Sequence, residues 1–276
     1  MTNKILRSTF VITICTVAVA AVFAITSCGK APAEPKSFAF DSWDTIAKVA
    51  EGGLDNLLET YKPIGGTFII QDLDDENETL AKTKRINLEG IGNYKVRVIA
   101  ENHDVCENGK TAALTFEFTK VINNVPFAKN NIISNEWESS ELRNYLNNKL
   151  FEMFPTDLKS AIKTVRKDTC VGGASSEVKT FSEKVFPLSV SEIDVSNINP
   201  VVEGKPYKLY VDHPYKPGSD DDPRNKDDKN YWLRSPMSQN ALNAYVIRVG
   251  KDEGFFSQVV FDDCSESIGV APAFCI

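Results

Sequence analysis

The feature that most constrains how this chain can fold is an uninterrupted apolar run near its N-terminus. Phe10 to Ile25 contains no charged residue and follows the basic residues Lys4 and Arg7. The run is short for the roughly 20 residues that a helix needs to cross the hydrocarbon core of a bilayer. A short apolar segment behind a basic start is typical of a secretory signal peptide. Residues 1–27 are therefore expected to take no part in the globular fold.

The end of this leader resembles the lipobox of bacterial lipoproteins. The residues are Ile25-Thr26-Ser27-Cys28-Gly29, and Ile25 and Thr26 depart from the commonest choices in that family. The resemblance implies that Cys28 becomes the mature N-terminus and carries lipid (palmitate), so that acyl chains hold the protein on a membrane. We therefore expect the cell envelope, outside the cytoplasm. The alternatives are a plain cleaved signal and an uncleaved N-terminal span. Residues 28–39 are Pro- and Ala-rich and indicate a tether.

The composition fits a globular region with an acidic surface. The hydrophobic fraction is 42%, enough for a buried core, and the net charge is -7. A nucleic-acid partner needs clustered Lys and Arg against its phosphates, and anionic lipid attracts basic segments. We therefore expect no nucleic acid, and membrane contact only through the lipid anchor.

Four cysteines remain after the leader and Cys28. They are Cys106, Cys170, Cys264 and Cys275. An exported protein can form disulfides, and four cysteines allow three pairings that the sequence cannot choose between; buried free thiols are the other interpretation. No two of them have C-x-x-C spacing, and only two histidines accompany them, so no metal site is expected.

Residues 40–122 are expected to form a helix and a small antiparallel sheet. Asp41 or Ser42 suits the N-cap position at the start of a helix. The runs 94–100 and 111–121 alternate apolar and polar residues, which is typical of half-buried strands.

Residues 123–276 are expected to mix helices with short strands. Asn135 resembles a helix N-cap, with Glu138 three residues later and an amphipathic pattern after it. The run 213–230 holds Pro, Gly and mostly charged residues, which indicates an exposed or disordered loop. The strands expected after it are 231–234, 244–249, 255–261 and 268–276.

Four blocks of the chain together resemble a known family. They are Val98–Asp104 with Leu114–Phe116, Trp137–Asn147, Lys184–Glu192, and Tyr231–Pro236 with Gly269–Phe274. Their order and the WLRSP block resemble the domain-of-unknown-function family six-two-seven-three, found in bacterial surface and phage-associated proteins, from about Phe40 to the C-terminus. That family has no established activity. The C-terminal part resembles, more distantly, C-type-lectin-like and formylglycine-generating-enzyme-like domains. The resemblance implies an α+β fold: a helix-plus-antiparallel-sheet N-terminal part (40–122) and a C-type-lectin-like part (123–276).

Some C-type-lectin-like domains are receptor-binding proteins that use exposed residues near the C-terminus. The comparable segment here is rich in Asn, Ser and aromatic residues, as adaptable binding surfaces are. The candidate ligand-binding residues are Met237, Ser238, Gln239, Asn240, Asn243, Tyr245, Phe255 and Phe256. The two phenylalanines are included because adjacent residues of a strand face opposite sides. The expected ligand is a protein or a glycan.

Two pairs of residues are expected to be structural rather than functional. Trp232 would fill the core while Arg234 pairs with an internal acid, although a guanidinium can also bind a ligand carboxylate. Trp137 with Arg143 receives the same interpretation.

No catalytic residue and no cofactor is expected. The P-loop, G-x-G-x-x-G, H-E-x-x-H and G-x-S-x-G motifs are absent. His103 and Asp104 are adjacent in an extended segment, so they point to opposite faces and do not form a base–carboxylate pair. The aspartates of 220–228 would suit Ca²⁺, but EF-hand spacing is absent and a solvated loop is favoured.

The expected function is that of an envelope-bound ligand-binding or adhesion module. One alternative is an enzyme related to formylglycine-generating proteins, which would place reduced Cys264 and Cys275 in one cleft. Another is a purely structural envelope component.

Overall fold

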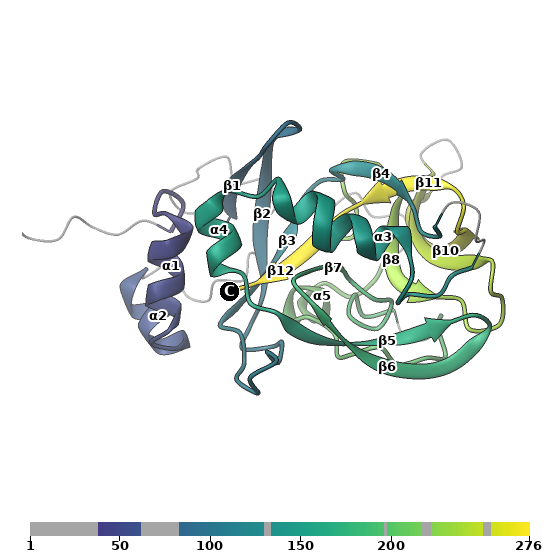
Figure 1. Cartoon of the computed structure of the whole chain (residues 1–276), viewed down its shortest axis with the longest axis horizontal. Helices are drawn as coiled ribbons and strands as arrows, with labels where there is room; N and C mark the ends of the chain where they lie inside the picture. The colour runs from purple at the N-terminus through teal and green to yellow at the C-terminus, as the bar shows by residue number, and fades with distance from the viewer. Residues whose placement is uncertain (1–37, 62–82, 130–133, 196–197, 217–221, 251–254) are drawn as a thin grey trace, which may run out of the picture. The chain divides into compact units, whose positions relative to one another are not determined.

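The computed structural model describes residues 38–61, 83–129, 134–195, 198–216, 222–250 and 255–276 (Figure 1). The side chains of residues 250 and 255–257 lie outside this description. Residues 36–276 form one compact unit. The predicted leader, Cys28 and the predicted tether as far as residue 37 lie outside the described residues. Phe38, within the 28–39 range predicted as tether, is instead buried and packs against Tyr61 and Phe116. Within the described part of the chain, no helix is long and apolar enough to cross a membrane.

The first helix begins where its N-cap predicts. Helix α1 (Trp43–Ala50) is capped by Ser42, whose Oγ accepts a hydrogen bond from the Thr45 backbone nitrogen at 3.2 Å. Helix α2 (Leu54–Thr60) follows directly. Trp43 packs edge-on against Phe116 and Phe274, with ring centroids 5.2 and 5.7 Å apart, which anchors α1 on the core.

The first sheet joins strands from both ends of the described chain. Its order is β1 (Thr83–Leu88), β2 (Gly92–Glu101), β3 (Leu114–Phe118), β12 (Pro272–Cys275) and β7 (Val185–Pro187), and all neighbours are antiparallel. Strand β12 lies beside β3 (Figure 1). It places Phe274 opposite Phe116, and the two rings stack at 5.2 Å. The boundary expected near residue 122 therefore falls within one compact unit whose two segments share a sheet and a core.

The second sheet carries most of the C-terminal strands. Its order is β10 (Phe255–Asp263), β9 (Asn243–Gly250), β8 (Tyr231–Pro236), β11 (Ser267–Val270) and β4 (Asn123–Pro126), with only β11 and β8 parallel. Trp232 is fully buried and donates through Nε1 to the Val125 carbonyl at 2.8 Å, so it ties β8 to β4 across β11.

A two-stranded hairpin, β5 (Val165–Gly172) and β6 (Ser175–Glu183), completes the strands. Its turn residues Gly173 and Ala174 both have positive φ, 64° and 61°, which is the geometry of a tight two-residue hairpin turn. A Cβ on Gly172 would lie 2.3 Å from the Asn135 carbonyl oxygen, so only glycine allows this close approach.

The main helical segment begins later than the sequence predicts. It consists of α3 (Glu141–Asn144) and the π-helical η1 (Tyr145–Leu150), and α4 (Thr156–Ala161) follows after Pro155. The N-cap is Ser140, whose Oγ accepts from the Arg143 backbone nitrogen at 3.1 Å. The prediction of Asn135 as the cap is wrong because its amide is used in tertiary contacts. The short helix α5 (Lys208–Asp212) lies further along the chain.

The α+β class is confirmed, but the expected half-burial of β3 is wrong. All five of its residues are buried. One face carries Phe116 in the aromatic core, and the other carries Glu117 and Thr115, which bind buried polar groups. Polar side chains on a buried face of a strand need such internal partners.

Candidate functional site

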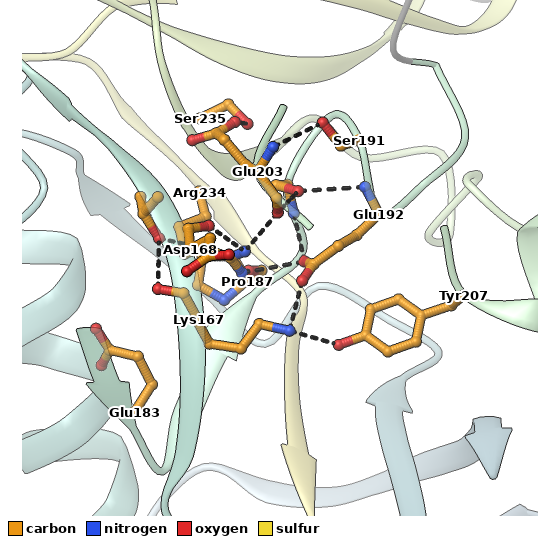
Figure 2. A network of polar contacts seen from close by, with 12 residues as sticks. Lys167, Asp168, Glu183, Pro187, Ser191, Glu192, Glu203, Tyr207, Arg234 and Ser235 are labelled. Carbon is orange, nitrogen blue, oxygen red and sulfur yellow. Dashed lines mark hydrogen bonds and ion pairs between the residues drawn. The ribbon is translucent and has the colours of Figure 1, made fainter. Parts of the chain in front are cut away.

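A buried polar cluster, here called the Lys167 network, contains Lys167, Glu192, Tyr207, Arg234 and Glu203 (Figure 2) together with Asp104. Lys167 Nζ lies 2.7 Å from Asp104 Oδ1, donates to the Tyr207 hydroxyl at 2.8 Å and forms an ion pair with Glu192. The ammonium group thus has three oxygen partners, the full number that it can satisfy.

Arg234 extends this network from β8. Its guanidinium lies 3.1 Å from Glu192, and it donates to Thr169 Oγ1 and to the Pro187 carbonyl, both at 2.8 Å (Figure 2). These contacts tie β8 to β5 and β7. This is the internal ion pair that the structural interpretation of Arg234 requires.

Glu203 is the acid of the Lys167 network whose pKa is raised. It accepts from the Cys170 backbone nitrogen at 2.9 Å and from the Ser235 hydroxyl, and it is fully buried. Burial raises its pKa to about 7 although Arg234 opposes the shift. Burial also works against ionised Asp104, but Lys167 brings the pKa of that carboxyl to about 2.

A second cluster, here called the Glu117 network, contains Glu117, Arg97, Lys226 and Tyr210. Glu117 lies 3.0 Å from Arg97 and 2.7 Å from Lys226 Nζ, and accepts from the Tyr210 hydroxyl at 2.7 Å. Burial, followed by the charge of Arg97, lowers the pKa of Lys226 to about 7. The ion pair with Glu117, at 2.7 Å, opposes this shift.

The Glu117 network overturns part of the expectation for residues 213–230. Arg224 and Lys226 are fully buried, and Asp222 is 5% exposed, so Asp222–Lys226 is not an exposed loop. The Arg224 guanidinium donates to the Ile193 carbonyl at 2.6 Å and pairs with Asp222 at 3.0 Å. The basic side chains of this segment bind a carbonyl and an acid that are distant in sequence, those of Ile193 and Glu117. Residues 217–221 lie outside the description.

A third group contains Trp137 and Arg143, the other pair expected to be structural. Glu183 is fully buried and accepts from Trp137 Nε1 at 3.1 Å and from Arg143 Nε at 2.7 Å. Asn147 donates to its second oxygen at 2.7 Å. Trp137 and Arg143 therefore share one acid and fix the helical segment on β6.

The geometry of these networks is that of internal supports. The six side chains of the Lys167 network are at most 4% exposed, so a substrate cannot reach them. His103 packs against Tyr207 with ring centroids 4.3 Å apart, and burial lowers its pKa. Among the described residues, no three His, Cys, Asp or Glu side chains gather to hold a metal ion.

The four cysteines of the described chain are free and buried. Cys275 lies on β12, where Sγ is 3.4 Å from Asp104 Oδ2 and burial raises its pKa well above the usual value. Cys264 follows β10 in the other sheet, with backbone bonds to Leu242 and Ala128. Both side chains are fully buried, so neither thiol is open to a cleft of the kind that the enzyme alternative requires.

The most exposed candidate residues lie in the turn between β8 and β9, here called the 237–243 loop (Met237 to Asn243). Fully buried Asn135 fastens it: Nδ2 contacts the carbonyls of Met237, Asn240 and Asn243 at 3.1, 2.9 and 2.6 Å. Its Oδ1 accepts from the Gly173 backbone nitrogen at 2.7 Å, which joins the loop to the hairpin turn.

Only part of the predicted contact set is available to a ligand. Gln239 and Asn240 are exposed, Met237 and Asn243 are partly buried, and Ser238 and Tyr245 are 7% and 4% exposed. The side chains of Phe255 and Phe256 at the start of β10 lie outside the described residues. The sequence missed Leu242, which is 46% exposed, and it missed Asn135 as the anchor. Gly172-Gly173 signals a tight turn but does not indicate which residue packs on it.

A polar groove of about 590 Å³ lies beside η1. Its lining includes Lys129, Asn148 and Asn147, whose amide binds Glu183, Lys184 and Val185. π-Helical turns occur often at functional sites, but here the turn places Asn147 on internal partners. The polar lining of the groove is thus explained by internal hydrogen bonds, and the 237–243 loop is the better candidate site.

Comparison with known proteins gives one match. No curated protein and no solved structure matches this chain. Residues 108–276 match the family described as Domain of unknown function (DUF6273), which includes β3 and every later element but neither β1 nor β2. This range begins later than the resemblance from about Phe40 that the sequence blocks indicate. Since the match covers more than half of the chain, the chain belongs to the DUF6273 family.

Proposed function

We propose that this chain is a lipid-anchored envelope protein whose globular region binds a protein or glycan ligand through the 237–243 loop. The observation that carries the proposal is the fastening of that loop by buried Asn135. A loop already held in one conformation loses less conformational entropy on binding. Its exposed side chains Gln239 and Leu242 offer one polar and one apolar contact.

The buried networks support binding over catalysis. Catalysis needs acids, bases or nucleophiles that touch a substrate. In the described chain, Glu203 and Lys226, whose pKa values are both shifted to about 7, are fully enclosed. They stabilise the framework that carries the loop.

The binding test uses the purified full-length protein in detergent on a glycan array and on a panel of immobilised extracellular-matrix proteins. The double variant Gln239→Ala/Leu242→Ser is expected to weaken any binding by about tenfold, the size of one good contact of about 1.4 kcal/mol. The control Lys208→Ala/Val211→Ser changes an exposed polar and an exposed aliphatic residue on α5 and should retain the affinity. Equal affinities for the two double variants would refute the loop as the site, and no binding on either panel would favour the structural-component alternative.

The anchor is tested separately through Cys28. Cys28→Ala removes the sulfur that would carry lipid, so the variant is expected in the soluble fraction without acyl mass, whereas the unchanged protein is in the membrane fraction. An unchanged mass and membrane association in the variant would refute lipidation at this residue.

A further inference from the structure

The β5–β6 hairpin has an edge without a partner among the described strands. Its sheet contains two strands only, and β5 is covered on its other side, where Arg234 donates to the Asp168 carbonyl at 3.3 Å. In β6, all residues from Ser176 to Thr180 are exposed, on both faces of the strand. A two-stranded hairpin is marginally stable by itself, and an open edge presents unpaired backbone groups to another strand.

The sequence of this edge is complementary to itself. When two copies of Ser176-Glu177-Val178-Lys179-Thr180 run antiparallel, with Val178 opposite Val178, Glu177 lies opposite Lys179 of the second copy and Lys179 opposite its Glu177. Ser176 then lies opposite Thr180. Side chains opposite each other in an antiparallel pair are close enough for opposite charges to stabilise it.

Other described edge strands lack this property. Strand β10 has no basic residue among 258–263, and β4 is short and ends at Pro126. Strand β1 has no acidic residue among 83–88. Strand β7 is held by Arg234 at Pro187.

We propose that β6 is a self-association edge, where a second copy of this chain adds its own β6 antiparallel about a two-fold axis at Val178. The pairing makes one four-stranded sheet from two hairpins. It is an isologous contact, in which the same surface of each copy meets its counterpart. Because Gly173 of the hairpin turn binds Asn135, which also fastens the 237–243 loop, the assembly would present two such loops.

The test is cross-linking of the full-length protein in the membranes of the expressing cell. A residue on the axis faces itself, with Cα atoms about 4.5–5.5 Å apart in an antiparallel pair, a separation that a disulfide can span. Val178→Cys is therefore expected to give a covalent homodimer with copper–phenanthroline. Val211→Cys, on a residue 52% exposed on α5, is the control, and the unchanged chain gives the background from its own cysteines.

Charge variants in the Val178→Cys background make the test specific. Adding Lys179→Glu places Glu opposite Glu twice, so the initial cross-linking rate should fall by about fivefold or more. Adding Glu177→Lys as well restores opposite charges and should restore the rate, and Lys229→Glu, an exposed change elsewhere, should leave it unchanged. Unreactive buried native thiols show that each variant is folded.

Three results would overturn the proposal. The first is a Val178→Cys homodimer no faster than that of Val211→Cys. The second is a cross-linking rate that does not change when Lys179→Glu is added. The third is a cross-link from Val178→Cys to a different protein with no homodimer, which would assign the edge to another partner.

Discussion

Replacing Asn135 tests whether its amide holds the 237–243 loop. The Asn135 Nδ2 group has two hydrogens for three carbonyl oxygens, and Oδ1 accepts one further bond from Gly173, so about three hydrogen bonds are lost in Asn135→Ala. At about 1 kcal/mol each, the free energy of unfolding should fall by about 3 kcal/mol. For a domain of this size, that corresponds to a melting temperature lower by roughly 6–12 °C.

Asn135→Asp separates this role from that of a helix cap. At an N-cap, Asp and Asn are nearly equivalent. In the structure, Asp would turn an oxygen toward three carbonyl oxygens, so it should destabilise the protein more than Ala does. Urea denaturation followed by circular dichroism measures both variants, and Ser140→Ala, at the observed cap, should cost about 1 kcal/mol. If Asn135→Asp is as stable as the unchanged protein, the assignment of Asn135 as the loop anchor is refuted.

Three further predictions concern the buried groups. Because the folded protein raises the pKa of Glu203 to about 7, it binds that proton more tightly than the unfolded chain, and stability should fall by about 3 kcal/mol as the pH rises from about 4.5 to 7. Glu203→Gln should remove that slope in chemical denaturation, and an unchanged slope would contradict the assignment. Lys226 has the opposite sign, since its lowered pKa makes stability rise between about pH 7 and 10.5, and Lys226→Met should abolish this rise. The four buried cysteines should resist a thiol reagent in the native protein, all react in guanidinium, and give the same intact mass with and without reductant; a mass increase on reduction would indicate a disulfide.

The local elements follow closely from the sequence. Ser42 begins α1 because its hydroxyl reaches a free backbone N–H one turn ahead. Pro155 separates two helices because it cannot donate in the helix interior. The apolar runs at 231–234 and 244–249 form β8 and β9 because aromatic and β-branched residues favour strands.

The candidate site was only partly predictable. The distant resemblance to C-type-lectin-like domains pointed to 237–245 as a surface segment, and Gln239 and Asn240 are indeed exposed. Tyr245 is buried instead, because its position on β9 faces the core side, where its hydroxyl reaches the Ile198 carbonyl at 3.5 Å. Exposure of a strand residue depends on which face its sheet covers, and the covering segment is distant in sequence.

What the sequence by itself determined is the class and the limits of the globular part. Hydrophobic periodicity, caps and turn residues act over a few positions, so they specified a mixture of helices and short strands, without the motifs of common catalytic sites. Only the tertiary structure decided the partners of the buried charges. Arg97 with Glu117, Lys226 with Glu117 and Asn135 with the 237–243 loop are separated by 20 to 109 positions. Such pairs form because burying a polar group costs free energy unless it is hydrogen-bonded. The arrangement of the strands determines which partner lies within hydrogen-bonding distance.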